Sequence, residues 1–239
     1  MQWNDRAIIL SVKKFSEHSA VVTLLSREHG IYSGVAKAAL SKKQCGTYQS
    51  GNWVHASWRA RLDEHMGSLQ CDLEKPVAAL AMHDRLALAG LNAVCAMMPL
   101  AMHERDPHPW VFDAAAQLLR KIACGEEWVS DYVRFEVSLL RDAGFGLDLT
   151  QCVASGVRSN LMYVSPKSGC AVSAVEGEPY KNKLLPLPAF LLQDDAVADL
   201  DGLKAGFRLT TYFFTEWMLA AHGGKMPAAR IRLVEMLVE

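Results

Sequence analysis

The spacing of hydrophobic positions divides the chain into a shorter N-terminal part and a longer C-terminal part. Up to about residue 75, short apolar runs rich in β-branched and aromatic side chains alternate with polar clusters, a pattern typical of strands joined by turns. Beyond Pro76 the spacing becomes helical, and proline is tolerated at the start of a helix but not inside a sheet. The pattern predicts strands at residues 7–13, 20–26, 31–36, 53–60 and 68–73.

Five short strands in so short a segment are typical of a small closed barrel such as an OB-fold, whose loops and open face commonly receive oligonucleotides. Residues 37–51, between the third and fourth predicted strands, contain Lys37, Lys42 and Lys43 with two glycines and little periodicity. The sequence therefore predicts a basic loop beside a small β-barrel.

The C-terminal part has the apolar periodicity of a helical bundle. Residues 77–98 predict one central, buried helix, and further helices are expected from Pro107 or Pro109 to residue 123, at 129–143, and from 188 onward. Gly144 is expected to end the third helix as a left-handed cap. We therefore expect a multidomain α and β protein: an OB-fold β-barrel at 1–75, an all-α helical domain at 76–144 and 188–239, and an irregular insert at 145–187.

Two cysteines lie near the ends of this insert. Cys152 and Cys170 have the outer spacing of a four-cysteine zinc ribbon with one cysteine from each half. A structural zinc site closes with four nitrogen or sulfur ligands, and Ser155 and Ser173 are poor substitutes for thiolates. The insert is therefore expected to be a degenerate, zinc-finger-like segment with no metal.

Charge is distributed unevenly along the chain. Residues 1–62 contain nine Lys and Arg against three Asp and Glu, a net charge of +6, whereas residues 63–239 contain 16 against 23, a net charge of −7. A local positive field on an otherwise acidic molecule indicates a polyanionic partner such as a nucleic acid. The alternative is a solvated basic face without a partner.

Composition places the protein among soluble globular proteins. Half of the residues are hydrophobic, with a mean hydropathy of +0.06, so the chain can offset the entropy of folding. The first residues lack a secretory signal, and the longest charge-free run, residues 86–102, includes Asn92 and Pro99 and falls short of a membrane span. Six evenly spread cysteines suit reduced thiols, so we expect a cytoplasmic protein that does not contact a membrane.

Catalytic motifs do not emerge from the sequence. Neither a P-loop nor a dinucleotide fingerprint has its glycines in place, and no nucleophile motif of a hydrolase is present. The densest set of ligand-type side chains is His103, Glu104, Asp106 and His108, which Pro107 and Pro109 place on a loop. We expect no cofactor, and keep a metal-dependent hydrolase on this loop as a minor alternative.

Aromatic and cationic residues are interleaved in the first 62 residues. Single strands bind where cations neutralise phosphates and aromatic rings stack on bases. The aromatic candidates are Phe15, Tyr32, Tyr48, Trp53 and Trp58, although burial in the barrel is the favoured explanation for each one taken singly. If Trp58 is buried, alternation along the strand directs Arg59 and Arg61 to solvent.

Several longer segments resemble one family, the bacterial recombination mediator RecO, in its alphaproteobacterial form. The resemblance covers nearly the whole chain and rests on Trp3 and the segments at residues 7–12, 19–30, 58–65, 144–149, 163–167 and 184–188. It implies an OB-fold, a helical domain, and an insert that in some members is a zinc finger. It implies no catalytic activity.

The resemblance also implies partners. Members of this family bind single- and double-stranded DNA, anneal complementary strands, and with RecR help RecA replace single-strand-binding protein (SSB), whose acidic C-terminal tail the helical domain recognises. We therefore expect a non-enzymatic mediator of DNA repair and recombination in the cytoplasm, associated with the nucleoid. An OB-fold RNA-binding protein is the main alternative. The expected DNA-binding residues are Lys13, Arg27, Lys37, Lys42, Lys43, Arg59 and Arg61.

The chain departs from the family in the insert, which keeps only Cys152 and Cys170, and around the basic loop, where Ala38 follows Lys37 and no proline precedes Gly51. For the SSB tail the resemblance implies an apolar pocket beside a cation. The candidate cations are Arg120, Lys121, Arg141 and Arg208.

Overall fold

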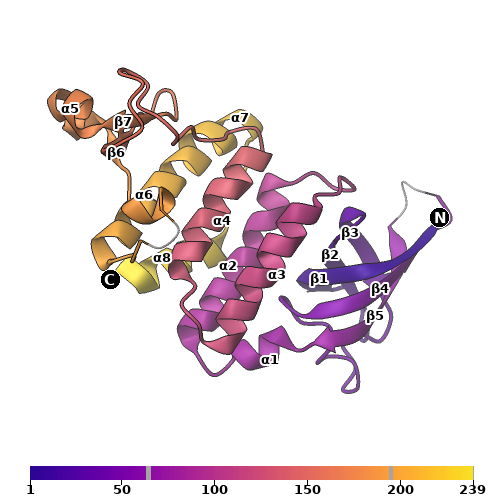
Figure 1. Ribbon diagram of the computed structural model, residues 1–239. Coiled ribbons are helices and arrows are strands. Elements are labelled where there is room, and N and C mark those ends of the chain that lie inside the picture. Colours follow the sequence, from indigo (N-terminus) through magenta and orange to yellow (C-terminus); the bar gives the residue numbers. More distant parts are fainter. Residues whose placement is uncertain (63–65, 194–195, 239) are drawn as a thin grey trace. The chain divides into compact units, whose positions relative to one another are not determined.

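The computed structural model describes residues 1–62, 66–193 and 196–238 (Figure 1). A β-rich N-terminal region is followed by a mostly helical region, as the sequence predicts. The chain forms two units, residues 1–128 with 227–236 and residues 129–226 with 237–239, which we describe separately. The three domain boundaries expected from the sequence, after residues 75, 144 and 187, stay a prediction.

Five strands form a closed barrel in the order β1, β2, β3, β5, β4. β1 pairs with both β2 and β4 and so closes the sheet, and all pairs are antiparallel except the short parallel pairing of β3 with β5. The strands are β1 (Gln2–Lys14), β2 (Ala20–Ser26), β3 (Gly30–Ala36), β4 (Trp53–Arg59) and β5 (Gly67–Lys75).

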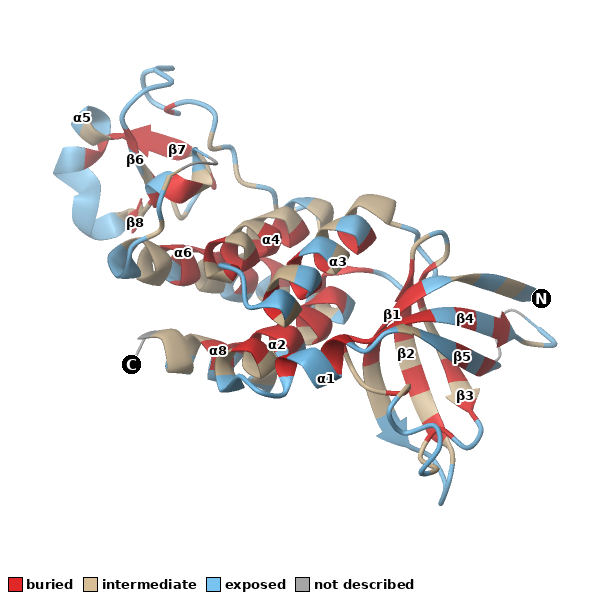
Figure 2. Cartoon of the chain, turned by 60° about the horizontal axis from the view of Figure 1, so that its bottom comes forward, coloured by how far each residue is buried: buried red, intermediate tan, exposed pale blue. Residues whose placement is uncertain are grey.

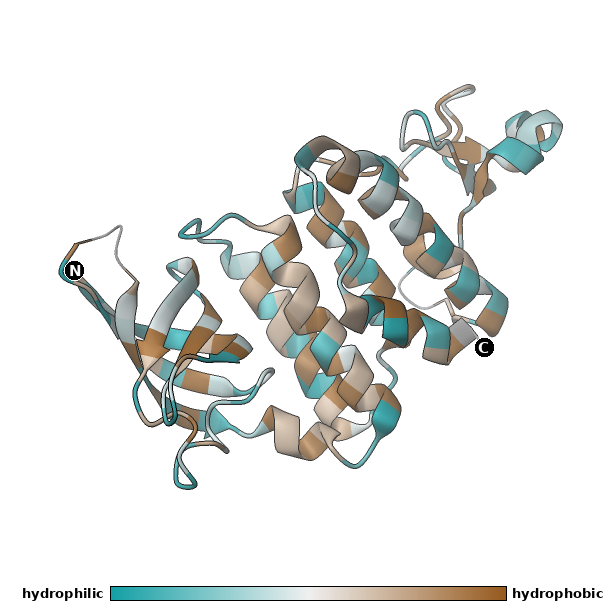
Figure 3. Cartoon of the chain, turned by 180° about the vertical axis from the view of Figure 1, so that it is seen from behind, coloured by the Kyte–Doolittle hydropathy of each residue, from teal (hydrophilic) through white to brown (hydrophobic). Residues whose placement is uncertain are grey.

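Alternation along the strands separates the barrel core from its outer surface. In β4 the even-numbered Val54, Ala56 and Trp58 are buried, whereas Ser57 and Arg59 are exposed (Figure 2). Figure 3 shows the same alternation as brown and teal bands along the barrel strands. The Trp58 ring fills the core, and its Nε1 donates to the Ser33 carbonyl at 3.1 Å. A Cβ atom at Gly67 would lie 2.4 Å from this ring, so only glycine fits there.

The middle of β1 is buried on both faces. Ala7 and Ile9 belong to the barrel core, while Ile8 and Leu10, which point the other way, are also buried. Helix α2 (Arg85–Ala101) covers this outer side, where the Cys95 thiol donates to the Ile9 carbonyl at 3.7 Å. The barrel and the first helices therefore share a continuous apolar interior.

The prediction of a single helix at residues 77–98 is wrong. The chain forms α1 (Val77–Ala81) and then α2, because Asp84 is extended and caps the second helix. Its carboxylate accepts hydrogen bonds from the amides of Leu86 at 2.7 Å and Ala87 at 3.3 Å. Aspartate is among the preferred residues at this position.

The remaining helices of the first unit are α3 (Pro109–Cys124) and α8 (Ala228–Val238). As predicted, α3 begins at a proline, and it is followed by Gly125, which caps it with a left-handed φ of 67°. No helix among the described residues combines the length and apolar character needed to cross a membrane.

The second unit is built on α4 (Val129–Asp142) and α6 (Leu200–Phe213). They meet at a buried polar contact, in which Thr210 Oγ1 donates to the Glu136 carboxylate at 2.6 Å. The predicted cap at Gly144 is confirmed by its φ of 86°. After α6 the helix continues as a π-helical turn (Phe214–Leu219) and α7 (Ala220–His222).

The insert is more regular than the sequence predicts. Three short strands form a sheet in the order β7, β6, β8, accompanied by helical turns. Strands of four residues or fewer give too little alternation to detect from sequence. The elements are β6 (Leu161–Val164), β7 (Ala171–Ser173), α5 (Ala174–Gly177), a 3-10 helix (Glu178–Lys183), β8 (Leu185–Pro186) and a 3-10 turn (Ala189–Leu191).

The two serines beside Cys152 contact its thiol. Burial opposes ionisation, but hydrogen bonds with Ser155 and Ser173 lower the pKa of Cys152 to about 6. Within the described ranges no group of three or more His, Cys, Asp or Glu is arranged to hold a metal. The insert is instead fastened to the helices of its unit, because Trp217 Nε1 donates to the Pro166 carbonyl at 3.1 Å.

Candidate nucleic-acid interface

A row of neighbouring side chains crosses the outer surface of four strands, β3, β5, β4 and β1. In the sheet register Val35 lies beside Ser68, Ser68 beside Arg59, and Arg59 beside Gln2. Cross-strand neighbours point to the same face of a sheet, so this row lies on one side of the barrel. Lys37 follows two residues after Val35 and therefore reaches the same side.

Two hollows meet along this row. One, of about 560 Å³, contains Lys37 and Arg59, and the other, of about 730 Å³, contains Arg59 and Arg61. They share Gln2, Arg59 and Ser68, and we call them together the barrel groove. Other polar side chains of the groove are Asn4, Gln44, Ser57 and Gln70, with one acid, Asp72.

The three groove cations are available to a ligand. Lys37, Arg59 and Arg61 are exposed, and within residues 1–62 and 66–193 none of them pairs with a carboxylate, since the ion pairs of the barrel involve other residues. A polar concave surface whose described residues include three unpaired cations and one acid is suited to an extended polyanion.

Arg27 is engaged elsewhere. Its Nε and Nη2 donate to the two carboxylate oxygens of Asp113 in α3 at 3.0 and 2.9 Å, and its Nη1 donates to Glu28 at 2.6 Å. These hydrogen bonds hold the pKa of Asp113 below its ordinary value. Arg27 joins the barrel to α3, and we leave it out of the proposed interface.

Lys13, Lys42 and Lys43 lie outside the groove, Lys13 near the end of β1 and the two others on the β3–β4 loop. The register places Lys14 beside Ala20 and Ala20 beside Ala36, so the β1–β2 turn and the start of the β3–β4 loop share one end of the barrel. The amide of Leu40 also donates to the carbonyl of His18 at 3.1 Å. All three lysines are exposed.

Most of the aromatic candidates are core residues. Tyr48, Trp53 and Trp58 are buried, so the hypothesis that these three rings stack on bases is wrong. Tyr32 is partly buried and packs edge-on against Trp58, with ring centroids 5.0 Å apart. Phe15 differs from the other four because its side chain is 65% exposed.

The basic loop is anchored by Asn52, which the sequence reasoning missed. Its Nδ2 donates to the carbonyls of Gly46 at 2.8 Å and Thr47 at 3.1 Å, and its Oδ1 accepts from the amide of Ala78 at 3.0 Å. Asn52 is 1% exposed. In the sequence, the feature that marks Asn52 is its position directly after Gly51. The same feature is found in ordinary turns, so it does not identify a residue that anchors a loop.

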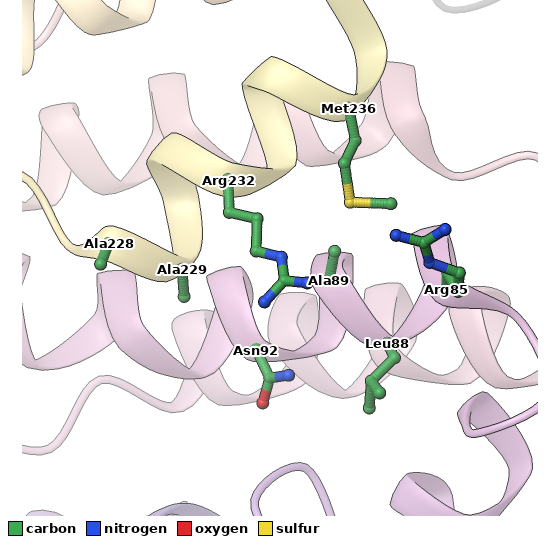
Figure 4. Close-up of a pocket in the computed structure, with 8 residues that line it drawn as sticks. All are labelled: Arg85, Leu88, Ala89, Asn92, Ala228, Ala229, Arg232 and Met236. Carbon is green, nitrogen blue, oxygen red and sulfur yellow. The ribbon is translucent and has the colours of Figure 1, made fainter.

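A second hollow in this unit lies between α2 and α8 and has a volume of about 430 Å³. Figure 4 shows Arg85 from α2 and Arg232 from α8 directed into the space between the helices, with Met236 beside them. Leu88, three alanines and Asn92 supply the rest of its mostly apolar wall. Both arginines are exposed and have no carboxylate partner among the described residues.

The cations expected to hold an acidic tail are placed differently. Arg120 forms two hydrogen bonds with Glu126, at 2.6 and 3.0 Å, and none of Arg120, Lys121, Arg141 or Arg208 lines the hollow between α2 and α8. The sequence alone does not show which helices pack together, so it did not reveal that Arg85 and Arg232 lie at the same hollow.

The loop at residues 103–108 makes a structural contact with the barrel. Arg105, with a φ of 64°, donates its amide to the Ile31 carbonyl at 3.0 Å, and its guanidinium lies 5.4 Å from the centroid of the Tyr32 ring. A Cβ at Gly30 would lie 2.2 Å from the carbonyl oxygen of Asp106, so the loop packs directly on the barrel backbone. The loop docks α3 against the strands, and no metal cluster is found among its described residues.

Two family models match the chain. Residues 1–75 match "Recombination protein O N terminal" and residues 82–223 match "Recombination protein O C terminal". Among curated proteins, the DNA repair protein RecO of Rhodospirillum centenum is 41% identical over 98% of this chain and 94% of its own length. That of Rhizobium johnstonii is 42% identical, over 98% and 92%, and that of Orientia tsutsugamushi is 39% identical, over 100% and 99%.

Proposed function

Since the chain belongs to the RecO family of recombination proteins, we propose that it is a DNA repair protein that binds single-stranded DNA in the barrel groove. The observation that carries this proposal is the convergence of Lys37, Arg59 and Arg61 on one concave face, where none of them pairs with a carboxylate of the described residues. The strand order of the closed barrel supports an OB-fold, and such barrels commonly hold oligonucleotides.

The proposed activity is strand annealing and needs no nucleophile. Groove cations neutralise the phosphates of a bound strand and so reduce its repulsion of a second strand. Because the rings of Trp58 and Tyr48 are buried, the groove binds mainly the backbone and leaves the pairing edges of the bases accessible. Double-stranded DNA presents the same phosphates and is proposed to bind more weakly through the same cations.

We propose three more specific roles for this protein because it belongs to the RecO family. They are association with RecR, loading of RecA onto SSB-coated strands, and action in the cytoplasm at the nucleoid. For the SSB tail we propose the hollow between α2 and α8, because its apolar wall suits a hydrophobic side chain and its two arginines suit carboxylates.

Reversing both charges of this hollow tests the tail site. The double variant Arg85→Glu, Arg232→Glu is expected to lower affinity for an SSB tail peptide by at least about 100-fold, since two charge-assisted contacts of roughly 1.5 kcal/mol each are lost. Fluorescence anisotropy with a labelled peptide measures the change, with Arg120→Glu, Arg208→Glu as the control of equal charge. Equal affinity in both variants would place the tail elsewhere.

Competition between DNA and RNA tests the nucleic-acid class. A labelled DNA 20-mer bound to the protein is expected to be displaced less readily by RNA of the same sequence than by unlabelled DNA. Stronger displacement by RNA would favour the alternative of an RNA-binding barrel.

The hydrolase alternative predicts a stoichiometric metal in purified protein that is lost on His103→Ala, which elemental analysis measures.

A further inference from the structure

Phe15 lies at the turn between β1 and β2 with 65% of its surface exposed. A phenylalanine in such a position gains nothing from the core, because its ring contributes to stability mainly when it is removed from water. The turn is nevertheless well defined. The amides of Phe15 and Ser16 both donate to the Ser19 carbonyl, at 2.9 and 3.1 Å, and the Ser19 amide donates to Ser16 Oγ at 3.2 Å.

The turn is also fastened to the neighbouring basic loop. The amide of Leu40 donates to the His18 carbonyl at 3.1 Å, and Leu40 itself packs against the barrel core. The exposed Phe15 ring is therefore carried by a turn that hydrogen bonds fix in one conformation. A rigid aromatic loses little conformational entropy when a partner covers it.

Four exposed lysines lie on the chain segments that adjoin this turn. Exposed lysines precede it in the chain, at Lys13 and Lys14, and lie on the adjoining loop at Lys42 and Lys43. One acid, Glu17, is 88% exposed and lies 3.9 Å from His18. Among described residues none of the four lysines has a carboxylate partner.

We propose that Phe15 stacks on an unpaired base while these lysines bind the flanking phosphates, which makes the β1–β2 tip a second DNA contact, distinct from the barrel groove. An exposed apolar ring on adjoining segments that carry four exposed lysines fits a nucleotide, which presents a flat face between anions, better than it fits an apolar protein surface. This inference rests on the proposed function, since it assigns base contact to the tip and backbone contact to the groove.

The test compares a normal strand with one of equal length that lacks bases. Wild-type protein is expected to bind oligo(dT) about tenfold more tightly than an abasic oligonucleotide, because one stacked base is lost. Phe15→Ala is expected to bind both equally, whereas Phe15→Tyr keeps the preference. Leu80→Ala, which removes an equally exposed apolar side chain from α1, is the matched control and is expected to behave as wild type.

Two further variants separate the inference from the function. Lys42→Glu, Lys43→Glu is expected to weaken binding of both oligonucleotides, and Arg59→Glu is expected to do the same through the groove. If Phe15→Ala keeps the full preference for bases while Arg59→Glu weakens binding, the tip proposal is wrong and the groove stands. If Arg59→Glu binds DNA normally, the groove itself is wrong.

Discussion

Reversing the charges of Lys37 and Arg59 together is expected to weaken binding of a single-stranded oligonucleotide by about 100-fold at moderate salt. Each cation removed from the barrel groove loses a charge-assisted phosphate contact of roughly 1.5 kcal/mol, and every 1.4 kcal/mol is tenfold in affinity. Both side chains are exposed, and neither forms an ion pair with the residues that the structure describes, so the substitution breaks no ion pair among them. Fluorescence anisotropy with Lys37→Glu, Arg59→Glu measures the loss.

The matched control changes the same charges in the other unit. Arg208 and Lys225 are exposed, and Lys225→Glu, Arg208→Glu alters net charge equally while leaving the barrel intact. This control is expected to lose less than threefold, because long-range repulsion is screened beyond about 10 Å. Equal losses in the two variants would mean that net charge, and not the groove, governs binding.

Asn52→Ala is expected to lower the free energy of unfolding by about 3 kcal/mol. The substitution removes three hydrogen bonds and leaves the buried amide of Ala78 without a partner, which alone costs about 1 to 3 kcal/mol. Two-state denaturation in urea, followed by the signal of the barrel tryptophans, measures the change. DNA affinity is expected to fall as well, because the basic loop loses its attachment to the barrel.

Asn52→Asp separates the two sides of this anchor. An aspartate keeps the oxygen that accepts from Ala78 but places its second carboxyl oxygen against the carbonyls of Gly46 and Thr47. We therefore expect a loss of stability at least as large as in Asn52→Ala, with the same weakening of DNA binding. Asn92→Ala, at an exposed position of α2, is the control. Unchanged stability in Asn52→Ala would show that water replaces the anchor at no cost.

The strands could be predicted from sequence because the signal is local. In β4 the buried residues Val54, Ala56 and Trp58 alternate with exposed residues. The predicted strand ended at residue 60, one residue beyond the observed end at Arg59. The break before α2 was missed although Asp84 is a good cap, because the alanine-rich composition on both sides of it favours helix. The sheet of the insert was missed because its strands are too short to alternate.

For the barrel groove, the sequence predicted the cationic residues but not that they lie side by side. Lys37, Arg59 and Arg61 were identified from charge and alternation, yet their convergence depends on the parallel pairing of β3 with β5, a contact between distant segments. For the same reason the sequence did not reveal that Asp113, 86 residues away, binds Arg27. Residue type alone could not separate Phe15 from Trp58, because exposure is decided by the closure of the barrel.

The dependence of DNA affinity on salt tests the groove most directly. Each phosphate neutralised on a single strand contributes about 0.7 to the slope of log affinity against log salt, through release of a bound counterion. The account predicts that Lys37→Glu, Arg59→Glu lowers the magnitude of this slope by about 1.4, while Lys225→Glu, Arg208→Glu leaves it as in the wild type. Parallel lines for wild type and the groove variant would contradict the claim that these cations contact the phosphates.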